Sequence, residues 1–530
     1  MAPLTDLYKQ LASHAPHLPF SAFILGGLLA VILYQSLSAR RKDKLPPGPR
    51  GLPFIGNAHQ VPKQTPWLTF ADWAKQYGDL MYATVVGQPV IIINSRKIAN
   101  ELMDKRSAIY SDRPVLVCFR SFHFCGYGTS FVIKPYGEDW RKQRRLVAQD
   151  FAPSTVGRYH GFQEKETRKM MKEMIQDPAN FIPRIKQTIG TIIVRVTYGY
   201  YVKSLDDPLL ATPLVALENF SEATAPGRFL VDIFPILKQI PRWMPGSAFL
   251  SIADAWRQDV MDTCWKPYDW CKDNLKTGKT LTPSVVGDVI ENSGGSLSKD
   301  DEDALVYAAS GIFGGGLDTN MSTAMSFFAY MILNPHVQKK AQEEIDSVVG
   351  VDRLPTIADR PDLPYVRAIM AEVLRSCPTI PLCIPHSLTQ DDFYEGYFLP
   401  KGAWIMPNIW QMLHDPEAYP NPMAFKPERY NGDDAEMEKA KTLSFGFGRR
   451  ICPGRHFAEG TAFSIMATAL ATCEIIPGLD ANGKEVLPTM EVTEGTIVSP
   501  TPFPMRLKMR ATPAAQLLFE EELEDPASIE

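Results

Sequence analysis

The sequence predicts a mainly α-helical protein with small β-sheets, preceded by one N-terminal transmembrane helix. Three observations support this prediction: an uncharged apolar run at 20–37, a helical pattern that continues from 298 to 334, and strand-like segments that are all short. Length alone would favour more than one domain, but length is a soft guide. With 45% hydrophobic residues in 530, the chain can bury a large core.

Charge and cysteine content narrow the class of protein. The net charge is −5, and basic residues are concentrated only near the N-terminus, so we expect no nucleic-acid partner. The eight cysteines are scattered without paired spacing and are far too dilute for a disulfide scaffold. We therefore expect reduced thiols facing the cytosol.

Residues 20–37 read FSAFILGGLLAVILYQSL and predict a membrane anchor. Four basic residues follow the run directly, at positions 40, 41, 42 and 44. The positive-inside rule then places 1–19 in the lumen of the endoplasmic reticulum and the catalytic body in the cytosol, as a single-pass protein. A cleaved signal peptide is the alternative, but such a peptide carries its positive charge before the apolar run.

Residues 38–53 form a basic and proline-rich linker. Its LPPGPRGLP stretch cannot form helix or central strand, so it should run extended and stiff as a spacer between membrane and domain. We expect one domain over 54–510. The remaining residues, 511–530, read as an acidic, disordered tail.

The first part of the domain predicts a helix at 67–77 and two strands, 80–86 and 90–94, joined by a Gly-Gln turn. A further helix begins at 138, and on it Trp140 and Arg144 share one face at i and i+4. The pair is either part of an ordinary surface helix or an indole N–H and a guanidinium that point together at a ligand.

Residues 206–250 are rich in Pro, Phe, Leu and Trp, which predicts helices broken by apolar loops. The apolar faces serve either ordinary packing or contact with lipid beside the anchor.

The long helix begins at a capping sequence, Ser298 to Asp301, and ends at Asn334, before a proline. Its middle contains GGGLDT at 314–319, although each interior glycine costs about 1 kcal/mol relative to alanine. Either another segment packs closely against the glycines or a ligand needs the space.

Several polar residues follow this helix. Glu372 and Arg375 share one helical face, and Arg429 lies downstream. His386 follows an extended proline-rich segment and is either a ligand-binding group or a satisfied buried histidine. Short strands with turns at 395–396 and 401–402 complete a small sheet within 391–408.

Residues 445–454 read FGFGRRICPG and present Cys452 in a glycine-rich loop. Glycines let the backbone approach the sulfur closely, and Arg450 supplies a cation for a buried carboxylate. The loop suggests an axial thiolate to haem iron, whereas a buried structural cysteine is the alternative. A helix at 455–473 and a hairpin within 492–508 follow.

These motifs together resemble the cytochrome P450 family over about residues 45–510. The resemblance implies the cytochrome P450 fold, with a single haem domain around one haem b and Cys452 as the axial ligand of its iron. The positions that match the haem-binding signature are Phe445, Gly448, Arg450, Cys452 and Gly454.

The resemblance also implies roles for residues outside this loop. The family places propionate ligands, an oxygen groove with a proton relay, and a buried ion network around the haem. The matching positions are Trp140, Arg144 and His386 for the propionates, Gly315, Gly316, Asp318 and Thr319 for oxygen and protons, and Glu372, Arg375 and Arg429 for the network.

Two residues depart from the family pattern. Asn320 replaces a second hydroxyl residue, and an amide cannot relay a proton as a hydroxyl does. Tyr430 stands where phenylalanine is more usual, a change that we expect to be mild.

By this resemblance the protein is a microsomal monooxygenase, most like fungal members of secondary metabolism or xenobiotic oxidation. It would take NADPH electrons from a flavoprotein reductase, with cytochrome b5 as a further candidate partner, and insert one oxygen atom into a terpenoid, steroid or polycyclic aromatic. The alternatives are a haem-thiolate isomerase or dehydratase without a reductase, and a non-catalytic haem-binding membrane protein. The expected pocket walls are the loop 115–133, with Phe119, Phe122, Phe124 and Phe131, the segment 380–384 and the hairpin tip 496–498.

Overall fold

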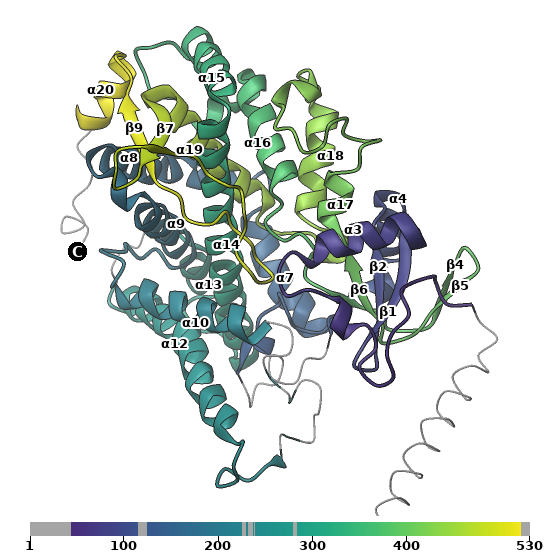
Figure 1. Ribbon diagram of the computed structural model, residues 1–530. Coiled ribbons are helices and arrows are strands. Elements are labelled where there is room, and N and C mark those ends of the chain that lie inside the picture. The colour runs from purple at the N-terminus through teal and green to yellow at the C-terminus, as the bar shows by residue number, and fades with distance from the viewer. Residues whose placement is uncertain are drawn as a thin grey trace, which may run out of the picture. The chain divides into compact units, whose positions relative to one another are not determined.

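The computed structural model describes residues 44–114, 125–224, 229, 231, 237, 239–278 and 283–520 (Figure 1). The predicted anchor at 20–37 and the segment 1–19, which we expect to be lumenal, lie outside these ranges. Among the helices that the structure describes, none combines the length and the apolar character needed to cross a bilayer. The described residues divide into two compact units, one containing 44–46 and 391–399 and the other containing the rest.

The smaller unit contains a β-hairpin. Strand β4 (Asp392–Tyr394) pairs antiparallel with β5 (Tyr397–Leu399). Glu395 and Gly396 both have positive φ, at 47° and 80°, as a tight two-residue turn requires. The predicted turn at this position is confirmed.

The larger unit contains two further sheets. The first has the strand order β1-β2-β6-β3, in which β2 runs parallel to β6 and the other pairs are antiparallel. Its strands are β1 (Leu80–Val85), β2 (Gln88–Ile93), β3 (His386–Ser387) and β6 (Trp404–Pro407). The second has the order β8-β7-β9 and consists of β7 (Cys473–Leu479), β8 (Glu485–Val486) and β9 (Met505–Met509).

Helices make up most of this unit, as predicted. Those before residue 300 are α3 (Pro66–Tyr77), α4 (Arg96–Ala99), the π-helix η2 (Asn100–Lys105), α5 (Ser107–Tyr110), α7 (Glu138–Asp150), α8 (His160–Gln176), α9 (Phe181–Tyr198), α10 (Pro208–Thr224), α12 (Ala248–Lys276), α13 (Val285–Asn292) and α14 (Lys299–Leu333). Those that follow are α15 (Pro335–Val348), α16 (Pro364–Ser376), α17 (Ile409–Leu413), α18 (Asp434–Ser444), α19 (Arg455–Thr472) and α20 (Pro513–Glu520).

Helix α14 is the long helix that the sequence predicts. The Ser298 side chain accepts a hydrogen bond from Asp301 N, which caps its start, and α15 begins at Pro335 directly after it. Eighteen of its residues are buried, because α14 packs against α7, α9 and α19 (Figure 1). It therefore forms one wall for anything held between these helices.

The end of the chain differs from the prediction. Residues 513–520, which we expected to belong to a disordered tail, form helix α20. Ala515 and Leu518 are buried in it, and α20 packs against α8 and α19. Three apolar residues at helical spacing outweigh the acidic composition that follows; residues 521–530 lie outside the described chain.

Candidate active site

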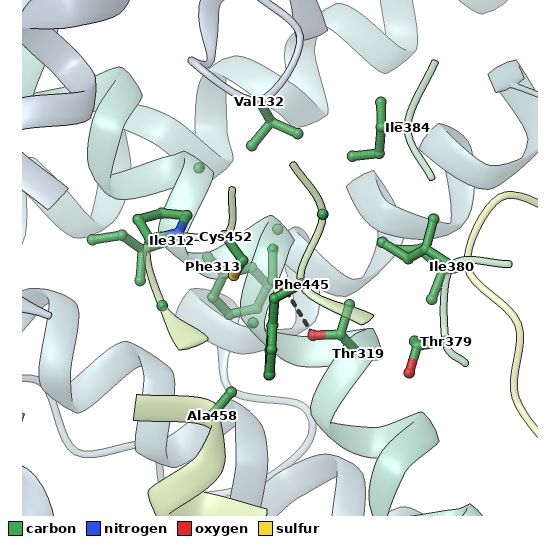
Figure 2. A pocket seen from close by; sticks show the side chains of 18 of the residues that line it. Val132, Ile312, Phe313, Thr319, Thr379, Ile380, Ile384, Phe445, Cys452 and Ala458 are labelled. Carbon is green, nitrogen blue, oxygen red and sulfur yellow. Dashed lines mark hydrogen bonds between the residues drawn. The ribbon is translucent and has the colours of Figure 1, made fainter. Parts of the chain in front are cut away.

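A cavity of about 310 Å³ lies between α14, α7, α9 and the loop that carries Cys452. Segments far apart in the sequence meet around it, and Figure 2 shows Thr319, Phe445 and Cys452 around the same space. The predicted site residues that line it are Trp140, Arg144, Gly315, Gly316, Thr319, Phe445, Arg450, Cys452 and Gly454. His386, Asp318 and Gly448 are not part of this lining in the described residues.

The loop before Cys452 is held in a tight conformation. Gly446 and Gly448 have φ of 84° and 53°, which favour glycine, and Cys452 N donates to Phe445 O at 2.8 Å. Burial raises the pKa of the Cys452 thiol, whereas the Gly454 N–H and the guanidinium groups of Arg144 and Arg455 lower it. A metal cation offsets such burial, because coordination deprotonates a thiol outright.

At the edge of the cavity formed by Trp140 and Arg450, one buried ring nitrogen lacks a hydrogen-bond partner, and a second one belongs to His386, outside the lining. Trp140 Nε1 and His386 Nε2 are buried, and neither has a hydrogen-bond partner among the described residues. The Arg450 guanidinium lies 4.7 Å from the Trp140 ring. Orphaned buried groups of this kind require an explanation, and an absent ligand is one.

The charge at this edge is also unbalanced. Burial, the guanidinium of Arg113 and that of Arg144 lower the pKa of Arg450 to about 8, although Asp112 raises it. Carboxylates placed here would relieve this repulsion and would accept from Trp140 Nε1. The two propionates of haem fit that description.

His386 fits less directly than the sequence suggests. Its Nδ1 lies 2.7 Å from the Tyr110 carbonyl oxygen, so Nδ1 carries the proton and Nε2 of the neutral ring is an acceptor. Burial and the charges of Arg113 and Arg450 hold the pKa of His386 well below its usual range. Nε2 can donate to a carboxylate only if the ring is protonated there as well, and a nearby carboxylate would favour that by raising the pKa of His386.

Arg113 was missed by sequence reasoning. It lines the cavity, is 6% exposed, and donates to the carbonyl oxygens of Val132, Ile384 and Pro385. Burial lowers its pKa to about 10. No local signal marks it, because its acceptors come from segments far away in the sequence.

The glycines of α14 allow both close packing of another segment and open space for a ligand, the two alternatives that the sequence leaves open. A Cβ on Gly316 would lie 2.8 Å from Ile193 Cδ1, so α9 packs closely there. A Cβ on Gly315 would meet nothing within 4 Å. Thr319 Oγ1 donates to the Gly315 carbonyl oxygen at 2.7 Å (Figure 2). The helix is thus packed on one face and open to the cavity at Thr319.

The two neighbours of Thr319 differ in environment. Burial raises the pKa of Asp318, with Lys186 lowering it and Glu218 raising it. Asn320 is 7% exposed, lines the cavity, and its Nδ2 donates to Gly316 O at 2.6 Å. Asp318 therefore points towards charged groups rather than into the cavity lining, whereas Asn320 faces it.

The predicted ion network assembles around Glu372 on α16. Arg375 contacts both of its carboxylate oxygens, at 2.8 and 2.9 Å, and Arg429 Nε contacts Oε1 at 3.0 Å. The Tyr430 hydroxyl, which was not assigned to the network, donates to Oε2 at 3.1 Å. Glu372 and Arg375 are both fully buried, so every lone pair and N–H of the pair needs such partners.

The expected substrate walls are present where the structure describes them. The tip of the predicted hairpin lines the cavity with Thr496 and Ile497, while Val498 N donates to Thr379 O at 2.9 Å. Phe131, Ile380 and Ile384 line it as well. Phe119, Phe122 and Phe124 lie outside the described residues.

Comparison with known proteins gives one consistent result. The family model described as Cytochrome P450 matches residues 46–502. Over 493 residues the chain is 47% identical to cytochrome P450 monooxygenase 105 of Postia placenta, covering 93% of this chain and 94% of the relative. It is 46% identical to cytochrome P450 monooxygenase 45 of the same fungus, covering 93% of each chain.

More distant relatives come from other fungi. Cytochrome P450 monooxygenase claR of Ampulloclitocybe clavipes is 38% identical over 496 residues, which cover 93% of this chain and 91% of the relative. Full-length similarity at this level shows the family, and the family implies haem with a cysteine thiolate ligand. The chain belongs to the cytochrome P450 family and is an oxidoreductase.

Proposed function

We propose that this protein inserts one oxygen atom of O2 into a C–H or C=C bond of an apolar organic molecule. The observation that carries the proposal is that Cys452 and Thr319 line one largely apolar cavity with unbalanced positive charge at its edge. Haem b, when bound, supplies the iron at which dioxygen is activated.

The residues present divide the work of holding this group. Cys452 would provide the axial thiolate. Arg144 donates to the Ile451 carbonyl oxygen and would thereby hold the Cys452 loop in place beside the haem. Trp140 and Arg450 would bind the propionates, together with Arg113. His386 would join them in its protonated form.

Thr319 and Asp318 would handle protons. The Thr319 hydroxyl now donates to Gly315 O, a bond that it can exchange for one to a ligand in the open groove beside Gly315. Asp318 precedes Thr319 in the helix, and burial raises the pKa of its carboxyl, which favours the protonated form that a proton relay needs.

The cavity walls favour an apolar substrate. Aliphatic and aromatic side chains dominate the cavity lining, and apolar walls exclude water from the reacting centre. Terpenoids, steroids and polycyclic aromatics share this apolar character, and we propose a role in secondary metabolism or xenobiotic oxidation. The apolar residues concerned include Phe131, Ile133, Leu217, Phe220, Val260, Phe313, Ile380, Ile384 and Ile497.

Electrons would come from NADPH through a membrane-bound flavoprotein reductase, with cytochrome b5 as a further candidate donor. The uncharged run at 20–37 and the basic cluster behind it support a single-pass location in the endoplasmic reticulum membrane with the domain in the cytosol. Phe54 and Trp243 are 75% and 80% exposed, which supports contact between the domain and lipid.

One experiment tests this function. The holoenzyme is incubated with reductase, NADPH, ¹⁸O2 and a panel of the three substrate classes, and products are analysed by mass spectrometry. Incorporation of one ¹⁸O atom that depends on NADPH supports the proposal. Product formation without NADPH would favour the isomerase or dehydratase alternative, and haem binding without turnover of any panel member would favour a non-catalytic protein.

A further inference from the structure

The π-helix η2 packs against the loop that carries Cys452. Its π character is set by Arg106 N, which donates to Glu101 O at 3.2 Å, five residues back. A π turn adds one residue to a helical turn and changes the direction of the side chains that follow. The Met103 carbonyl and the Asp104 carboxylate of η2 both meet Gly448.

The contact at Gly448 leaves no space for adjustment. A Cβ at this position would lie 2.2 Å from the Met103 carbonyl oxygen and 3.1 Å from Ser107 Cβ, and φ is 53°. The Gly448 N–H donates to Asp104 Oδ1. The loop therefore rests on the backbone of η2 and is tied to it by a charge-assisted hydrogen bond, which is stronger than a neutral one.

We propose that Asp104 is a positioning residue for the Cys452 thiolate. Three consecutive residues, 448–450, hold the loop by hydrogen bonds, and Asp104 binds the first of them. Arg449 donates to the Tyr136 hydroxyl, and Arg450 donates to three backbone carbonyls. Cys452 N closes the loop by donating to Phe445 O, so a shift at Gly448 is transmitted to the sulfur.

The neighbouring carboxylate on the same turn provides a matched control. Glu101 pairs with Lys105 at 2.9 Å and with Arg106 at 3.6 Å. Both partners lie within five residues of Glu101, and neither belongs to the loop that carries Cys452. It carries the same charge as Asp104 and lies on the same helix. Glu101→Gln thus removes a charge from η2 without removing a contact to the loop.

The inference rests on Cys452 being the haem ligand, which Cys452→Ala tests separately. Asp104→Leu, Asp104→Asn and Glu101→Gln are compared as holoenzymes. The measured quantity is the rate at which the reduced carbon monoxide complex loses its thiolate-type Soret band in mild urea. Circular dichroism melting of the same samples reports stability of the whole chain.

Asp104→Leu should lose the thiolate band about tenfold faster, equivalent to about 1.4 kcal/mol, with a melting temperature close to that of Glu101→Gln. Asp104→Asn keeps an acceptor oxygen and should restore most of the difference. A wild-type rate in Asp104→Leu would overturn the proposal. So would an Asp104→Asn rate equal to that of the leucine variant, because the acceptor would then be irrelevant.

A measurement on the wild-type enzyme keeps the test decisive if Asp104→Leu does not fold. Hydrogen exchange of the Gly448 amide should be protected, at least about tenfold slower than in a free peptide of the loop. Exchange at the rate of the free peptide would contradict the bond on which the proposal stands.

Discussion

The Tyr430 hydroxyl donates a hydrogen bond to Glu372 Oε2 at 3.1 Å, and both residues are buried. Glu372 thereby has partners from Arg375, Arg429, Tyr430 and the Lys426 backbone N–H. A residue that departs from the usual phenylalanine has become part of the network that joins α16 to the segment before α18.

Tyr430→Phe should destabilise the protein mildly. The change removes one hydrogen bond but leaves three other groups on the Glu372 carboxylate, so the free energy of unfolding should fall by about 1 kcal/mol. Urea unfolding of the holoenzyme measures it. Arg375→Met is the contrast, since it removes a buried positive charge and two hydrogen bonds from the buried carboxylate and should cost about 3–5 kcal/mol; equal effects of the two variants would contradict this account.

Thr319→Ala should separate oxygen activation from product formation. The variant keeps Cys452 and the cavity but loses the hydroxyl that faces the groove beside Gly315. We expect an unchanged carbon monoxide spectrum and several-fold more hydrogen peroxide released per NADPH consumed. Thr323→Val is a matched control, because the Thr323 hydroxyl also lines the cavity but donates to Thr319 O. An unchanged ratio of hydrogen peroxide released to NADPH consumed in Thr319→Ala would contradict a role of Thr319 in the proton relay.

Asp318→Asn should change how stability depends on pH. Burial raises the pKa of Asp318, so the unfolded chain loses this proton first as pH rises, and the wild type loses stability from about pH 4 up to the raised pKa. Asparagine carries no such proton. The variant should therefore gain stability relative to the wild type across that interval and show no gain below it, measured by urea unfolding at several pH values. A difference that is the same at every pH would contradict the raised pKa.

Removal of residues 1–43 should release the protein from membranes. The deletion removes the uncharged run at 20–37 and most of the basic cluster behind it. Fractionation of cells that express the full-length and truncated chains measures the result, and the carbon monoxide spectrum confirms that the domain still folds. A truncated chain that stays with membranes would show that apolar surface such as Trp243 is sufficient for binding. The double change with Trp243→Ser tests that directly.

Much of the architecture could be predicted from local sequence. The bounds of α3, α14 and α19 and the start of α7 follow from apolar periodicity together with capping serine, proline and glycine, which act within a few residues of the chain. Helix α20 was missed because the acidic composition after it dominated a short apolar pattern. Composition describes a segment, whereas burial of Leu518 depends on what packs against it.

The candidate site could be predicted only where a local motif carried it. The Cys452 loop and the Thr319 groove have compact signatures. Arg113 and Asp104 have none, because Ile384 and Gly448, which they contact, lie hundreds of residues away in the sequence. The environment of His386 was also beyond the sequence, since its proton is placed by the Tyr110 carbonyl oxygen and its pKa by neighbouring guanidinium groups.

The most direct test of the central claim is the spectrum of the reduced carbon monoxide complex in wild-type enzyme and Cys452→Ala. Thiolate coordination gives a strongly red-shifted Soret band, so the wild type should show it and the variant should lack it while still binding haem through the donors around Trp140 and Arg450. Cys383→Ala, which removes another thiol that lines the same cavity, should keep the band. Survival of the band in Cys452→Ala would contradict the account.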